Sequence, residues 1–285
     1  MESRSIAFRG AGGIALIGDA VGDPSAPPAL LLHGGGQTRH AWGGTARVLA
    51  RHGFHCIAID HRGHGDSGWP EEPDYNLETF ATDVVEIVAQ LGRPPLVIGA
   101  SLGGLAALLA EGERGPILSG LVLVDVAPRL EIAGVQRVVG FMQRGIDGWA
   151  TLDEAADAIA AYLPNRARPR DTSGLQKNLR QGPDGRWRWH WDPRFVRRDR
   201  GDPGWSRARF DAAAHRLTLP TLVVRGRMSD VLSEEGVRDL LALVPHAKYA
   251  DVAGAAHMVA GDDNDAFTSA VVEFATQIAR SRPAQ

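Results

Sequence analysis

The sequence predicts an α/β protein with a mostly parallel, doubly wound sheet. Short apolar runs typical of buried strands alternate with helical runs over residues 29–125. The alternation is absent over residues 129–216 and resumes at Leu219. We therefore expect one α/β-core domain formed by residues 1–128 and 217–285. Residues 129–216, called here the inserted segment, follow the sixth expected strand and are expected to form a mostly helical cap.

The expected strands differ in character along the chain. Two polar, glycine-broken runs favour antiparallel edge strands at residues 4–8 and 13–20. Apart from the strand at 248–252, the remaining strands are short, mostly apolar runs, which is typical of strands buried on both faces of a parallel sheet. They are expected at residues 29–32, 55–60, 95–99, 121–124, 219–224 and 248–252.

Helices are expected between these strands. Over residues 77–91, the apolar side chains of Leu77, Phe80, Val84 and Val88 recur at three- or four-residue spacing, which gives a helix one buried face. The other expected helices cover residues 42–52, 102–111, 154–162, 234–243 and 266–279.

Composition excludes several classes of function. The chain has 285 residues, 44% of them hydrophobic and 23% charged, with a net charge of −3. This balance predicts neither a nucleic-acid partner nor a membrane partner, and no apolar run approaches the length of a membrane span. Met1–Arg4 opens no signal-like stretch, and Cys56 is the only cysteine, so we expect a cytoplasmic protein without disulfides. This composition is also compatible with a homodimer.

The segment Gly99–Gly103 reads G-x-S-x-G and lies between an expected strand and an expected helix. A strand and a helix joined directly through a serine require a sharp turn, and the flanking glycines let the two elements pass closely. The Ser101 hydroxyl would then stand at the carboxyl end of a strand, where open α/β sheets bind ligands. We interpret Ser101 as a nucleophile; the alternative is a plain small-residue turn.

A serine nucleophile needs a base, and the base needs an orienting acid. His257 follows the last expected strand and is the predicted base. Asp230 follows the strand at 219–224 and is the predicted acid. Asp125, at the end of the strand at 121–124, is the rival acid.

Donors for an oxyanion are also present. His33 and three glycines follow the first buried strand and match a loop that supplies a backbone N–H to a developing oxyanion. We expect the N–H groups of Gly35 and Leu102 to form the oxyanion hole, with Gly36 as the alternative to Gly35. A phosphate-binding loop is the alternative, but no Walker or dinucleotide pattern follows.

We expect neither a metal nor an organic cofactor. Residues 60–67 hold two histidines and two aspartates, which is a set of metal-ligating residue types. Their alternation with Gly63 and Gly65 favours a tight turn over a metal site.

These motifs resemble those of the α/β-hydrolase superfamily over nearly the whole chain. The resemblance rests on the glycine loop at 33–36, the D-x-R-G-x-G-x-S turn at 60–67, the elbow around Ser101, Asp230 and the Gly-x-x-His at 254–257. It implies a catalytic triad of Ser101, His257 and Asp230.

The subfamily is less clear from the sequence. Epoxide hydrolases and haloalkane dehalogenases carry an aspartate at the nucleophile position, where this chain has Ser101. Meta-cleavage C–C hydrolases share the glycine loop, the serine and the mid-chain cap.

The inserted segment is rich in tryptophan and arginine. In Trp187–Trp191, alternation along an extended chain would place three tryptophans on one face, with Arg188 and His190 on the other. The tryptophans are either a wall over the active site or a small core of the segment itself. The basic residues either attract an anionic substrate or form a solvated surface. We expect Gly36, Trp189 and Met258 to contact the substrate.

The sequence therefore predicts a serine hydrolase that cleaves a small carboxylic ester or lactone through an acyl-enzyme. Two alternatives stay open: a hydrolase of C–C bonds in vinylogous diketone acids, and a ligand-binding member of the fold without catalytic activity.

Overall fold

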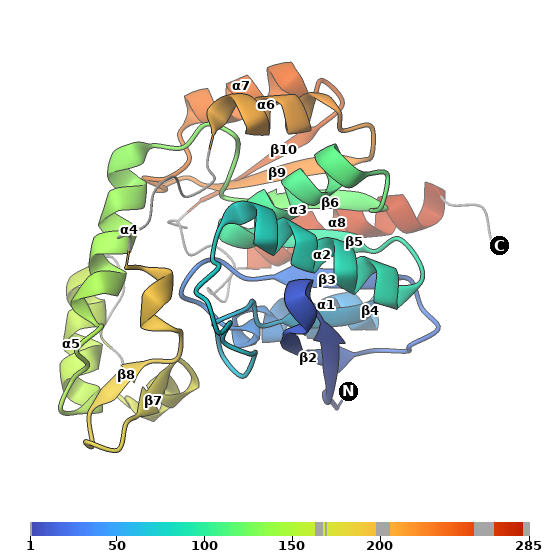
Figure 1. Cartoon of the computed structure of the whole chain (residues 1–285). Coiled ribbons are helices and arrows are strands. Elements are labelled where there is room, and N and C mark those ends of the chain that lie inside the picture. Colours follow the sequence, from blue (N-terminus) through green and yellow to red (C-terminus); the bar gives the residue numbers. More distant parts are fainter. Residues whose placement is uncertain (1, 163–167, 169, 198–205, 254–264, 282–285) are drawn as a thin grey trace.

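An eight-stranded sheet forms the centre of the described part of the chain (Figure 1). The computed structural model describes residues 2–162, 168, 170–197, 206–253 and 265–281. The strand order is β1-β2-β4-β3-β5-β6-β9-β10; β1 pairs antiparallel with β2 and β2 with β4, and the other neighbours are parallel. The strands are β1 (Arg4–Arg9), β2 (Ala15–Val21), β3 (Pro28–Leu32), β4 (His55–Ile59), β5 (Leu96–Ala100), β6 (Gly120–Val124), β9 (Thr221–Gly226) and β10 (Lys248–Val252).

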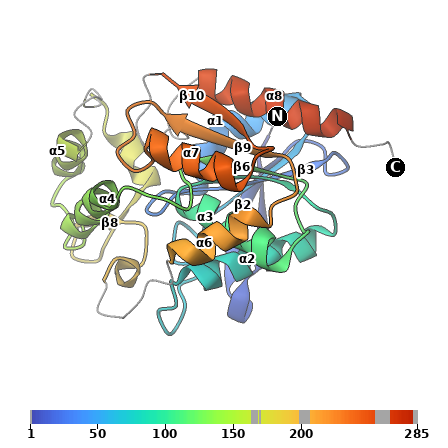
Figure 2. The same cartoon turned by 90° about the horizontal axis from the view of Figure 1, so that it is seen from above.

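Helices cover both faces of this sheet, as Figure 2 shows. One face carries α1 (Gly43–Arg51) and α8 (Asp265–Ser281), which bury Leu49 and Val271 against the strands. The other face carries α2 (Leu77–Leu91), α3 (Leu102–Arg114), α6 (Arg207–His215) and α7 (Glu234–Leu243). The inner strands β3, β4, β5, β6 and β9 are therefore buried on both sides, which explains their mostly apolar sequences.

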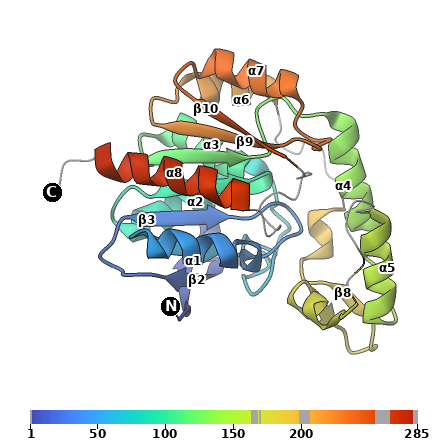
Figure 3. The same ribbon diagram turned by 180° about the vertical axis from the view of Figure 1, so that it is seen from behind.

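The inserted segment leaves the sheet after β6 and returns at β9. It contains α4 (Ile132–Arg144), α5 (Leu152–Tyr162) and a hairpin of β7 (Leu179–Gln181) and β8 (Trp187–Trp189). Figure 3 shows these elements standing beside the sheet. Its final helix, α6, packs instead on α3: a Cβ at Gly112 would lie 2.5 Å from the carbonyl oxygen of Ala213. The cap boundaries at 129 and 216 stay a prediction.

The predicted fold class is confirmed, and α2 and α7 begin and end at the predicted residues. Local capping explains this agreement. The Asn76 side chain accepts the Thr79 N–H at 2.8 Å at the start of α2, and Gly92 ends the helix with φ of 70°. Ser233 caps the start of α7 in the same way.

The sequence did not predict α4, α6, the β7–β8 hairpin or the short 3-10 helices at Ala11–Gly13, Arg39–Trp42, Ser173–Lys177 and Pro193–Phe195. Gly134 and Gly140 weaken the helical signal of α4, and the three-residue strands are too short for a periodic pattern. Within the described ranges, no helix is long and apolar enough to cross a bilayer.

Candidate active site

Ser101 occupies a sharp turn between β5 and α3. Its backbone has φ of 45° and ψ of −112°, in a region that L-residues rarely adopt, and its N–H donates to the Val124 carbonyl at 3.1 Å. The strain is held by close packing on both sides. A Cβ at Gly99 would lie 2.6 Å from the Gly104 nitrogen, and a Cβ at Gly103 would lie 2.6 Å from the Leu32 carbonyl oxygen.

The glycine loop lies directly beside this turn. A Cβ at Gly34 would lie 3.4 Å from the Ser101 Cβ, and a Cβ at Gly35 would lie 4.0 Å from Leu102 Cδ2. Leu102 is the first residue of α3, so its N–H belongs to the four that a helix leaves without a partner in its own first turn. The structure thus brings together Ser101, Gly35 and Leu102, as an oxyanion hole requires.

The three N–H groups of the glycine loop differ in whether they have a hydrogen-bond acceptor. The Gly34 N–H donates to Gln37 Oε1 at 3.0 Å, and the Gly36 N–H donates to His64 Nε2 at 3.1 Å. Among the residues that the structure describes, the Gly35 N–H has no hydrogen-bond acceptor. Gly35 is therefore the better of the two predicted loop donors, since the N–H of Gly36 is already taken.

Asp125 lies at the end of β6, one strand from Ser101. Its side chain is fully buried and its φ is 52°. Oδ1 accepts the Gly226 N–H at 3.0 Å, and Oδ2 accepts the hydroxyl of Ser229. Donors from the β9 end thus hold this carboxylate at the carboxyl edge of the sheet.

Asp230 has different surroundings. Its carboxylate forms an ion pair with Arg137 of α4, and its side chain is 35% exposed. The predicted base His257 and the predicted substrate contact Met258 lie outside the described residues.

The family profile described as the alpha/beta hydrolase fold matches residues 27–263 of this chain. This chain belongs to the α/β-hydrolase family. The predicted resemblance is thereby confirmed.

Several relatives of this α/β hydrolase are named as esterases or hydrolases. An esterase of Mycobacterium tuberculosis (Rv0045c) is 29% identical over 78% of this chain and 73% of its own length. A 3-hydroxybutyrate-oligomer hydrolase of Cupriavidus necator is 28% identical over 83% of this chain and 84% of its own length. The crystal structure of an α/β hydrolase from Novosphingobium aromaticivorans matches with a TM-score of 0.80, at 25% identity over 97% of this chain and 99% of that one.

Beneath the glycine loop, this α/β hydrolase carries a cluster of buried histidines. His33 Nε2 accepts the His61 N–H at 3.0 Å, and the His61 ring bonds the His33 carbonyl oxygen at the same distance. His64 completes the cluster, with its ring centroid 5.2 Å from that of His33. Each ring bonds backbone groups rather than another side chain, so the cluster ties the glycine loop to the turn at 60–67.

Burial keeps these rings neutral. It lowers the pKa of His61 to about 3 and that of His64 to about 4, and it holds the pKa of His33 well below its usual value. A neutral imidazole can accept one hydrogen bond and donate another, which is what the bonds to the backbone require.

The inserted segment docks on the same turn. His190 Nδ1 accepts the Gly65 N–H at 2.7 Å, and the Asp192 N–H donates to the Gly63 carbonyl at 2.8 Å. The Tyr75 hydroxyl also donates to the Asp192 carboxylate, at 2.6 Å. The residues following β8 are therefore fixed to the hydrolase core.

Aromatic side chains of this part of the inserted segment lie against the glycine loop. A Cβ at Gly36 would lie 3.3 Å from the Trp191 ring and 2.8 Å from Met142 Cε, and one at Gly35 would lie 3.4 Å from the Phe195 ring. The sequence left open whether Trp191 would reach the site, and it did not predict Met142 or Phe195 there, because it does not show which side chains of an irregular segment return to the core.

Trp189, the predicted substrate contact, packs one layer further out. Its ring stacks on Trp191 at 4.6 Å and meets Trp149 edge-on at 4.9 Å and Phe141 at 5.5 Å. Trp189 thus belongs to a small aromatic core of the inserted segment, whereas Trp191 reaches the glycine loop.

The arginines of the inserted segment are largely paired with aspartates. Arg180 bonds Asp66, Arg188 bonds Asp184, and Arg194 bonds Asp192. This pairing favours a solvated, charge-balanced surface over an anion-attracting one.

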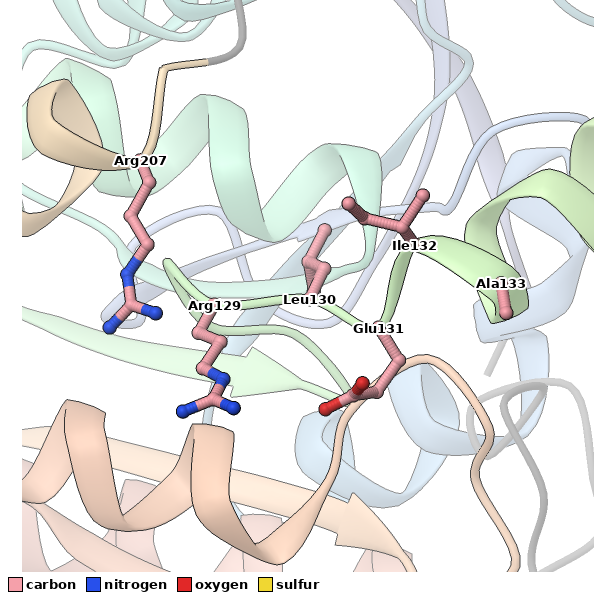
Figure 4. A pocket seen from close by; sticks show the side chains of 6 residues that line it. All are labelled: Arg129, Leu130, Glu131, Ile132, Ala133 and Arg207. Atoms are coloured by element: carbon pink, nitrogen blue, oxygen red, sulfur yellow. The ribbon is translucent and has the colours of Figure 1, made fainter.

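A cavity of about 440 Å³ opens where the inserted segment leaves the core (Figure 4). Its lining comprises Arg129, Leu130, Glu131, Ile132, Ala133 and Arg207. Both arginines bond Asp239 of α7, and neither Ser101 nor Asp230 is among the described residues that line the cavity. We therefore assign it no part in the chemistry.

Proposed function

We propose that this α/β hydrolase cleaves a small carboxylic ester or lactone through an acyl-enzyme on Ser101. The strained turn at Ser101, with Leu102 and the glycine loop beside it, carries the proposal. Acyl transfer needs such parts: a nucleophile, here the half-buried Ser101, and backbone N–H donors next to it. The esterase names of several relatives support the same class of substrate.

The proposed reaction has two stages. The Ser101 oxygen attacks the substrate carbonyl carbon while its proton passes to His257, and the N–H groups of Gly35 and Leu102 stabilise the oxyanion. The C–O bond to the leaving group then breaks, and His257 returns the proton to that oxygen. Water then attacks the acyl-enzyme while His257 takes one of its protons; the bond between the acyl carbon and the Ser101 oxygen breaks, and His257 returns the proton to that oxygen, which releases the acid and the free serine.

The orienting acid is either Asp230, as the order of strands suggests, or Asp125. The geometry favours Asp125, because its carboxylate is buried and fixed by Gly226 and Ser229. Asp230 is partly exposed and already paired with Arg137. An acid that must stabilise a histidinium ion is more effective in a buried, preorganised position. We therefore propose Asp125 as the acid.

The surroundings of the glycine loop favour an apolar substrate portion. Met142, Trp191 and Phe195 present a thioether and two aromatic rings there. A C–C hydrolase would need a free arginine for the acid group of its substrate, and Arg137 of α4 is instead paired with Asp230. A small ester or lactone with an apolar acyl group fits these walls better.

The first test is hydrolysis of p-nitrophenyl esters with increasing acyl length. We expect turnover of the short esters, and labelling of Ser101 by a serine-directed phosphonate. The Ser101→Ala variant should keep its thermal unfolding temperature and lose at least about 10³-fold in kcat. A folded Ser101→Ala variant with wild-type turnover would contradict the proposal.

A further inference from the structure

The peptide group of Gly36 is held on both sides by histidine rings. Its N–H donates to His64 Nε2 at 3.1 Å, and its carbonyl oxygen lies 3.4 Å from His190 Nε2. The two rings are themselves close, with centroids 5.9 Å apart. His64 comes from the turn at 60–67 and His190 from the inserted segment, so three separate parts of the chain meet at this one peptide.

We propose that His64, supported by His190, is a positioning residue that selects which N–H of the glycine loop faces the oxyanion. By binding the Gly36 N–H, His64 turns that donor away from Ser101 and fixes the loop so that the Gly35 N–H points to the reacting carbonyl. The inference rests on the proposed acyl-transfer function, which it deepens by naming what orders the oxyanion hole.

The hydrogen bonds of His64 define its tautomer. Nε2 accepts from Gly36, so the ring proton is on Nδ1, which donates to the Arg62 carbonyl oxygen at 2.9 Å. The ring is fully buried and packs edge-on against Phe195 with centroids 4.7 Å apart. A buried ring with both nitrogens bonded to backbone has one orientation, which is what a positioning role requires.

His190 fixes the other side of the arrangement. Its Nδ1 accepts the Gly65 N–H at 2.7 Å, so Nε2 carries the proton and faces the Gly36 carbonyl oxygen. Gly65 follows His64 directly in the chain, so His190 also restrains the backbone that carries His64. The inserted segment is therefore coupled to the oxyanion loop by hydrogen bonds as well as by the packing of Trp191.

Gly36 itself depends on this arrangement. Its φ of 79° lies in the left-handed region, and a Cβ there would lie 2.8 Å from Met142 Cε and 3.3 Å from the Trp191 ring. A glycine has wide conformational freedom, so without the His64 bond the Gly36 peptide could rotate and compete with Gly35 for the oxyanion.

Two substitutions of His64 distinguish the role of its acceptor, Nε2, from that of its donor, Nδ1. In His64→Gln, the amide oxygen can take the place of Nε2 and accept the Gly36 N–H. In His64→Asn, the shorter amide reaches only the place of Nδ1 and leaves Gly36 free. We expect His64→Asn to lower kcat by about 10- to 100-fold, since one misplaced oxyanion donor is worth up to 10²–10³. KM should change little, and His64→Gln should recover most of the loss.

A trifluoromethyl ketone gives a readout that structural damage alone would not produce. It forms a tetrahedral oxyanion on the nucleophilic serine, so its inhibition constant should rise in parallel with the fall in kcat for His64→Asn. Equal kcat and equal inhibition constants for wild type, His64→Asn and His64→Gln would overturn the inference, provided that wild type turns over esters and is labelled at Ser101.

His190 provides a second pair of variants if His64→Asn does not fold. His190→Asn keeps an acceptor for the Gly65 N–H, whereas His190→Leu removes both hydrogen bonds and keeps an apolar side chain. We expect His190→Leu to lower kcat with little change in KM, and His190→Asn to lie between it and wild type. Wild-type kcat in both variants would overturn the supporting role of His190.

Amide hydrogen exchange tests the geometry without any turnover. The Gly36 N–H should be protected in wild type and in His64→Gln, and exposed to exchange in His64→Asn. A protein that shows this pattern but no ester turnover or phosphonate labelling would refute the proposed function, while the contact on which the inference depends would stand. An unprotected Gly36 N–H in an active wild-type enzyme would refute the inference alone.

Discussion

The hydroxyl of Ser229 donates a hydrogen bond to the buried carboxylate of Asp125. Ser229 follows β9 and Asp125 follows β6, so the bond joins the ends of two neighbouring strands. The donors at the end of β9 therefore bind Asp125. Asp230, the residue that follows Ser229, is not the carboxylate that they hold. The choice of acid can be tested on this difference.

Asp125→Asn and Asp230→Asn form a matched pair. We expect Asp125→Asn to lower kcat by about 10³- to 10⁴-fold, because an amide cannot stabilise the charged base and favours its wrong tautomer. Asp230→Asn should lose only the partly exposed ion pair with Arg137 and change kcat less than about tenfold. Steady-state kinetics on a p-nitrophenyl ester measure both. The opposite order would assign the acid to Asp230.

Gly103→Ala tests the close approach of β3 to α3. The added Cβ would lie 2.6 Å from the Leu32 carbonyl oxygen, a backbone atom that cannot move aside. We expect a loss of about 2 kcal/mol or more in the free energy of unfolding, measured by chemical denaturation. Gly140→Ala in α4 is the control, because no atom lies within 4 Å of its added Cβ. It should gain about 0.5–1 kcal/mol. Equal effects at the two positions would contradict this packing.

Acidification should weaken the fold through the buried histidines. Burial lowers the pKa of His64 to about 4 and the pKa values of His61 and His190 to about 3, against 6.5 for an exposed histidine. The unfolded chain therefore binds more protons below pH 6.5. The contribution of these histidines to the free energy of unfolding is fully present above pH 6.5. It is lost progressively as the pH decreases from about 6.5 toward 4. Each such histidine contributes up to about 1.4 kcal/mol per pH unit.

Chemical denaturation at pH 7.5, 6 and 5 measures this slope. The His190→Asn variant removes one of the buried histidines, so its free energy of unfolding should decrease less steeply with falling pH than that of wild type. Identical free energies for wild type at pH 7.5 and pH 5 would contradict the prediction.

Phe195→Ala should change the preferred acyl length. The Phe195 ring lies 3.4 Å from the position of a Cβ on Gly35, so its removal opens space beside the proposed oxyanion donor. We expect the optimum in kcat/KM to move to longer p-nitrophenyl esters. Trp149→Ala is the control, because Trp149 packs on the outer side of Trp189. An unchanged optimum in Phe195→Ala would place the acyl group elsewhere.

Sequence patterns predicted the core well, because its strands and helices repeat with simple periods. The strand–serine–helix order around Ser101 is local in the chain, and so is its close packing through Gly99 and Gly103. The glycine loop was likewise recognised from adjacent residues. The family and the fold class followed from such local patterns.

The sequence did not predict contacts between segments that are distant in the chain. The hydrogen bond between His190 and Gly65 joins residues 125 positions apart, and no periodic pattern in the sequence indicates it. Asp125 and Asp230 have similar positions after neighbouring strands, and only burial and the Arg137 ion pair distinguish them. Alternation places Trp189 and Trp191 on the same face but does not show how deep each side chain lies, so it does not distinguish Trp191 as the one that reaches the glycine loop.

The inserted segment departs from β6 and rejoins at β9, and these two strands are hydrogen-bonded neighbours. Because the two strands are parallel, Val124 and Thr221 lie about 10 Å apart along the strand direction and about 5 Å apart across the sheet. The entropic cost of closing a loop grows only slowly with its length. The inserted segment can therefore be lengthened, shortened or exchanged with a small effect on the stability of the sheet. Chains that share this strand order can therefore diverge in the molecules they accept while their nucleophile stays in place. A chimera in which a foreign segment replaces residues 130–205, so that Asp125 and α6 are kept, should fold around the same serine.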